Sequence, residues 1–233
     1  MTLILVVAIV SAALVAGAIW GLYLPLPRPL EGFLIALAGG ALIVSVMEEL
    51  IRPALESLSF PLLTLSVAAG ALLFTAADRQ LEKSTEGSEG GGLLLAITFD
   101  GVPENLALGV ALIGTSGLEV AALAGSILLS NLPEAAGGAK GMAEGGMSRR
   151  RILMLWVGTA ALLAGAAIVG NLALAGVSDA WLAAIRCFAA GAVTASLATE
   201  VFPKAFREDH FGTGLAITLG LIVALGLSQL SGG

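Results

Sequence analysis

Two short segments place carboxylates inside otherwise apolar stretches of the chain. The first reads Asp100-Gly-Val-Pro-Glu104 and the second reads Ser130-Asn131-Leu-Pro-Glu134. In each segment an oxygen-bearing residue precedes the glutamate by four positions, so both side chains share one face of a helix. A carboxylate at membrane depth is costly and usually faces a cavity, a partner or a bound ion. If the two faces meet, they surround one point with carboxylate, hydroxyl and amide oxygens, a set that suits a cation.

A proline stands directly before each of these glutamates. Pro103 and Pro133 lack an amide donor and obstruct the carbonyl four residues back, which predicts a kink and a freed backbone oxygen at Phe99 and Leu129. A cation site explains the prolines, the carboxylates and their duplication together. The alternative is a pair of kinked structural helices, whose acids are protonated or hydrogen-bonded to Ser, Thr and Asn.

The composition of the chain indicates that these segments cross a membrane. Apolar residues make up 58% and charged residues 12%, and the mean hydropathy is +0.99; a soluble chain of this length could not bury so much apolar surface. A spanning helix needs about 20 mostly apolar residues. Eight such stretches are found, at 2–21, 31–51, 61–78, 92–114, 117–139, 151–173, 180–203 and 211–231. Three tryptophans near their ends fit interfacial anchors: Trp20, Trp156 and Trp181.

The distribution of positive charge predicts how the spans are oriented. Short loops rich in Lys and Arg stay cytoplasmic, and nearly all such residues lie after the first, third, fifth and seventh stretches. Both termini are therefore expected to be extracytoplasmic, with residues 79–91 forming a cytoplasmic loop. The net charge of -6 offers no basic surface for nucleic acid. The sequence thus predicts an all-α, multi-pass protein of the cell membrane, a single domain over 1–233 in contact with membrane lipid.

The second and seventh stretches share an internally repeated sequence motif, called the echoed motif below. Both carry Gly, Ser and Glu at the same spacing, followed by proline: Gly40, Ser45, Glu49 and Pro53 in one, and Gly191, Ser196, Glu200 and Pro203 in the other. The fourth and fifth stretches echo each other through their Pro-Glu pairs. In the predicted topology the paired stretches run in opposite directions, which is typical of the inverted repeats that many transporters use. We therefore expect eight helices in a 3+2+3 inverted-repeat bundle.

The motif pair resembles the ZIP (Zrt/Irt-like) divalent metal transporters, whose fourth and fifth helices carry a His-Asn-x-Pro-Glu-Gly motif and a second Pro-Glu motif. The resemblance extends to the eight spans and their arrangement. It implies that Glu104 and Glu134 stand where the family has metal-bridging carboxylates, and that Asn131 stands where the family has Asn or Asp. Dimers occur in that family, so a homodimer is one partner to test.

Departures from the family pattern bear on which metal is bound. Asp100 and Ser130 replace the motif histidines, and Gly101 replaces the asparagine of the first motif. An all-oxygen set shifts preference from zinc toward harder ions, although zinc binds such sites when it is available. Zinc, manganese and iron remain candidate substrates, and magnesium and calcium are not excluded.

Four other residues are candidates for an entrance or exit path. Glu48 and Glu49 lie toward the outer end of the second stretch, where they would gather cations or simply be solvated. Glu200 lies toward the inner end of the seventh stretch, and His210 follows it in a loop, where a lone histidine is more often a surface residue.

The leading function is a divalent metal transporter, not an enzyme, that moves metal toward the cytoplasm through a site formed by Asp100, Glu104, Ser130, Asn131 and Glu134. A proton-coupled carrier or exporter of another substrate would use the same scaffold. A membrane-embedded acid/base enzyme is the weakest alternative, because the chain has neither an H-E-x-x-H nor a G-x-S-x-G motif.

Overall fold

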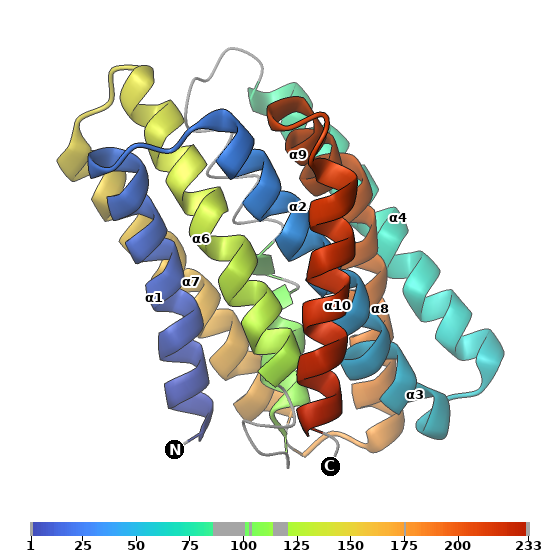
Figure 1. Cartoon of the computed structure of the whole chain (residues 1–233). Coiled ribbons are helices and arrows are strands. Elements are labelled where there is room, and N and C mark those ends of the chain that lie inside the picture. Colours follow the sequence, from blue (N-terminus) through green and yellow to red (C-terminus); the bar gives the residue numbers. More distant parts are fainter. Residues whose placement is uncertain (1, 86–100, 103, 114–120, 175, 232–233) are drawn as a thin grey trace.

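The computed structural model describes residues 2–85, 101–102, 104–113, 121–174 and 176–231, and the regular structure within them is entirely helical (Figure 1). The helices are α1 (Thr2–Tyr23), α2 (Arg28–Ser45), η1 (Val46–Ile51), α3 (Arg52–Ser57), α4 (Phe60–Thr85), α6 (Ala121–Glu144), α7 (Arg149–Leu174), α8 (Asp179–Ser196), η2 (Leu197–Val201), α9 (Phe202–Glu208) and α10 (Thr213–Ser231). Residues 104–111, between α4 and α6, are also helical and are called the 104–111 helix below. The all-α prediction is confirmed for the described residues.

Five of the described helical stretches are long and apolar enough to cross a membrane. They are Leu3–Tyr23, Arg28–Ser57, Phe60–Gln80, Arg149–Leu174 and Asp179–Glu208; a shorter apolar helix covers Thr213–Gln229. The start of α1 and the end of α10 lie at the same end of the bundle (Figure 1). This architecture is compatible with a multi-pass membrane protein.

Several helices extend beyond the predicted apolar stretches. α4 continues to Thr85, so residues 79–85, which belong to the predicted cytoplasmic connection, are helical. α6 continues to Glu144, and the helix that contains α2 continues through η1 and α3 to Ser57. The predicted limits followed the loss of apolar residues, whereas a helix persists through polar residues that favour it, such as Gln, Glu and Lys.

Two π-helical segments lie within the two copies of the echoed motif. η1 joins α2 to α3, and η2 joins α8 to α9, in each case with proline in the first turn of the helix that follows. Proline removes one amide donor and crowds the carbonyl four residues back. A π-helical turn is wider than an α-helical one and commonly marks functional positions. The glutamates of the echoed motif lie in these widened turns.

Glycines bring two pairs of helices into backbone contact in a matched pattern. In the pair α2 and α10, a Cβ at Gly40 would overlap the carbonyl oxygen of Ile217, and one at Gly220 would overlap that of Leu37. In the pair α4 and α8, the corresponding clashes involve Gly191 with Val67 and Gly70 with Phe188. Close approach of this kind is typical of small residues at helix interfaces in membranes. Gly40 and Gly191 are the equivalent glycines of the echoed motif.

One tryptophan does not lie where the sequence suggested. Trp156 of α7 is fully buried, in a cluster with Leu14 of α1 and Met142 of α6. The prediction that it anchors the protein at the membrane interface is therefore wrong, because helix packing covers its ring. Trp181 at the start of α8 is exposed and retains the features of an anchor.

Candidate cation site

The 104–111 helix lies in the core of the bundle. Its Ala107 and Leu108 belong to one apolar cluster with Leu42 of α2 and Val193 of α8, and this cluster also includes Ile127 of α6. Leu108 is one turn beyond Glu104, and Ile127 is one turn before Asn131. If the two helices run in opposite directions, as the predicted topology has it, Glu104 and Asn131 lie on the same side of the shared cluster.

The polar residues of the first motif are buried. Glu104 is 7% exposed and its neighbour Asn105 is 2% exposed. The Asn105 amide donates a hydrogen bond of 2.9 Å to the backbone oxygen of Gly101. The amide of Asn105 is thus committed to the backbone of its own helix, while Glu104 places a carboxylate inside the bundle.

The second motif lies in the middle of α6, which continues as one helix through Pro133. Asn131 is 3% exposed, and its side-chain amide donates a long hydrogen bond of 3.4 Å to the backbone oxygen of Val10 in α1. Glu134 is partly buried one turn further along. Ser130 is in α6, but its side chain lies outside the described part of the structure. Asn131 and Glu134 thus both come from α6.

Asp100 and Pro103 lie outside the described residues. Within the described part of the chain, no group of three or more His, Cys, Asp or Glu side chains is placed to hold a metal ion. The set that the sequence predicts contains only two described carboxylates, Glu104 and Glu134, and its third, Asp100, is not among the described residues. The complete ligand set therefore stays a prediction.

Two residues that the sequence analysis did not assign to the site hold the 104–111 helix in place. Asn171 of α7 donates a hydrogen bond of 3.0 Å to the backbone oxygen of Gly109. Arg186 of α8 donates one of 3.1 Å to the adjacent oxygen, that of Val110. A charged residue within an apolar helix was the available signal for Arg186; a single asparagine such as Asn171 gives too weak a signal on its own.

The predicted entrance acids lie in the second half of the continuous helix formed by α2, η1 and α3. Both Glu48 and Glu49 are in η1, and α3 follows them. The Glu48 carboxylate forms an ion pair of 3.0 Å with Arg52, which is one turn away. Glu49 is partly buried, as Glu48 is.

The two residues predicted for the exit path are separated by α9. Glu200 is partly buried in η2. His210 is exposed beyond the end of α9, with its ring 4.3 Å from that of Phe206 and 5.1 Å from that of Phe211, measured between centroids. These contacts fit a surface histidine that packs against aromatic neighbours. The structure does not place His210 beside Glu200.

Comparisons with known proteins found no matching family model and no matching curated protein.

Proposed function

We propose that this protein is a divalent metal cation transporter whose substrate passes through a site formed by helices 104–111 and α6. The observation that carries the proposal is the burial of Glu104 and Asn131, each in a Pro-Glu motif, within the core of an apolar helical bundle. Carboxylate and amide groups inside a membrane-spanning bundle commonly mark the pathway of an ion or substrate. The resemblance of both motifs to the ZIP metal-site motifs supports the same conclusion.

The paired features of the fold support an inverted-repeat arrangement. The matched glycine contacts and the two π-helical segments relate α2, η1, α3 and α4 to α8, η2, α9 and α10. We propose a 3+2+3 bundle with both termini extracytoplasmic, in which one repeat moves against the other and exposes the site alternately.

The oxygen-only ligand set favours manganese and iron alongside zinc. We propose Asp100, Glu104, Ser130, Asn131 and Glu134 as the ligands and inward movement as the direction. A carboxylate-rich site has no imidazole or thiolate to select zinc, so discrimination among these ions is weak.

Uptake into proteoliposomes with a panel of divalent ions tests this function. Glu104→Gln and Glu134→Gln remove one negative charge each at constant size, and each is expected to reduce uptake to near the background of empty liposomes. Glu56→Gln is the matched control, because Glu56 is exposed at the end of α3. It should leave uptake unchanged.

Three outcomes would contradict the proposal or redirect it. Absence of flux for every ion in the wild type, or normal flux in both site variants, would exclude the transporter mechanism described here. Flux that follows an imposed pH gradient and needs no divalent ion would instead indicate the proton-coupled carrier.

A further inference from the structure

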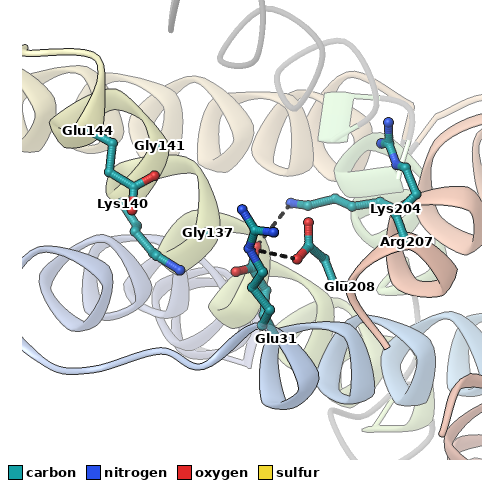
Figure 2. Close-up of a pocket in the computed structure, with 9 residues that line it drawn as sticks. Glu31, Gly137, Lys140, Gly141, Glu144, Lys204, Arg207 and Glu208 are labelled. Carbon is teal, nitrogen blue, oxygen red and sulfur yellow. Dashed lines mark ion pairs between the residues drawn. The ribbon is translucent and has the colours of Figure 1, made fainter. Parts of the chain in front are cut away.

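The start of α2, the end of α6 and α9 lie at the end of the bundle away from the termini (Figure 1). They surround a polar cavity of about 430 Å³. The residues that line it come from the start of α2, the end of α6 and α9 (Figure 2). Seven of its nine lining residues are charged: Arg28, Glu31, Lys140, Glu144, Lys204, Arg207 and Glu208. In the predicted topology this is the cytoplasmic end.

One carboxylate connects all three walls of the cavity. The side chain of Glu31 is only 8% exposed, and its Oε1 lies 3.8 Å from the Lys204 ammonium of α9 (Figure 2). The same oxygen lies directly against Gly137 of α6, where a Cβ would overlap it. Glu31 thus bridges α2, α6 and α9, and the absence of a side chain at Gly137 makes room for it.

The bridge lies next to the candidate site along the chain. Gly137 is three residues after Glu134 in α6, an advance of about 5 Å along a helix axis. Lys204 is four residues after Glu200 of η2. Movement of α6 relative to α2 and α9 therefore has to separate the Glu31 carboxylate from Gly137 or from Lys204.

The other ion pair among the residues that line the cavity is much more exposed to solvent. Arg28 and Glu208 also approach within 3.8 Å, but the Arg28 side chain is 81% exposed. Exposed pairs contribute little, whereas removing one partner of a buried pair leaves an uncompensated charge. Arg28 and Glu208 therefore serve as an internal control for the bridge.

We infer that the Glu31–Lys204 ion pair, seated against Gly137, is the gate that closes the path between the candidate cation site and the cytoplasmic face. The gate rests on the proposed transport function, since a closed path has meaning only for a substrate that passes. It opens when α6 moves relative to α2 and α9, so that the Glu31 carboxylate leaves Gly137 or Lys204.

Labelling of cysteines behind the gate by a membrane-impermeant maleimide tests this inference in nanodiscs, where both faces are accessible. Ile35→Cys and Ala38→Cys are two independent reporters, because both positions are buried on the face of α2 that carries Glu31. The native Cys187 is also buried, and the protein without a reporter measures its background.

Breaking the pair is expected to raise the labelling rate of both reporters about tenfold. The variants are Glu31→Gln, Lys204→Met and Gly137→Ala, the last of which displaces the carboxylate without removing a charge. Combining Glu31→Gln with Lys204→Met should add nothing to either single change. Lys204→Arg should keep the rate near that of the wild type, and the matched control Glu208→Gln should not alter it.

Unchanged labelling in Glu31→Gln and Lys204→Met would overturn the gate, as would an equal increase in Glu208→Gln. Labelling requires no ion flux, so the two proposals fail separately. A wild type without flux whose labelling still responds to the pair would refute transport alone. Normal flux with unresponsive labelling would refute the gate alone.

Discussion

Three of the buried polar residues in this bundle are accompanied by a backbone oxygen or by an opposite charge. Asn105 and Asn131 donate to carbonyls, and Glu31 is accompanied by Lys204. An unpaired polar group in an apolar interior costs free energy, which explains why each amide is directed at a carbonyl. The carboxylates at Glu104 and Glu134 are the residues for which a cation is the proposed companion.

At the residue scale, Asp100→His tests whether this position sets metal preference. Imidazole suits zinc better than manganese, so the ratio of zinc to manganese uptake should rise severalfold. The measurement is competitive uptake of the two ions into proteoliposomes. Asp78→His, which adds the same imidazole in α4, is the control and should leave the ratio as it is. An unchanged ratio in Asp100→His would remove this residue from the ligand set.

At the scale of elements, the π-helical segments explain how proline follows a polar motif within one long helix. In α2–η1–α3, the carbonyl that Pro53 obstructs belongs to Glu49, and in α8–η2–α9 the carbonyl that Pro203 obstructs belongs to Thr199. A wider turn relieves that conflict without ending the helix. Glu49 and Glu200 both lie in these π-helical segments.

The matched glycines allow a prediction about helix packing. Gly40→Ala and Gly191→Ala each place a Cβ on a carbonyl oxygen of the neighbouring helix, and each should lower the free energy of unfolding by about 1–3 kcal/mol. Gly158→Ala in α7 meets nothing within 4 Å. It should be neutral or stabilising by about 0.5–1 kcal/mol, because alanine favours helix over glycine.

Thermal unfolding in detergent, followed by the loss of monodisperse protein, measures all three glycine variants. If the two repeats are equivalent, Gly40→Ala and Gly191→Ala should lower the unfolding temperature by similar amounts. A large effect of one and none of the other would count against the equivalence of the α2–α10 and α4–α8 contacts.

At the scale of the whole molecule, the sequence predicted the helical class and most helix positions, because long apolar stretches leave few alternatives. It missed where helices end, since α4 and α6 continue through polar residues that remain good helix formers. It noted Pro53 and Pro203 but not the π-helical turns before them, which depend on how the rest of the helix is packed. It also missed the Glu31–Lys204 bridge, because the two residues lie far apart in the sequence and meet only when α2 packs against α9.

The arrangement of the whole chain across the membrane leads to a topology prediction. Ser59 lies between α3 and α4, and Ser148 lies between α6 and α7, and both are exposed. Cysteines at these two positions should be labelled from opposite faces of intact cells or sealed vesicles, Ser59→Cys from the outside and Ser148→Cys from the cytoplasm. The reason is that Arg149, Arg150 and Arg151 directly follow Ser148 and favour cytoplasmic retention. Labelling of both from one face would contradict the predicted topology and would place the Glu31–Lys204 bridge on an unassigned side of the membrane.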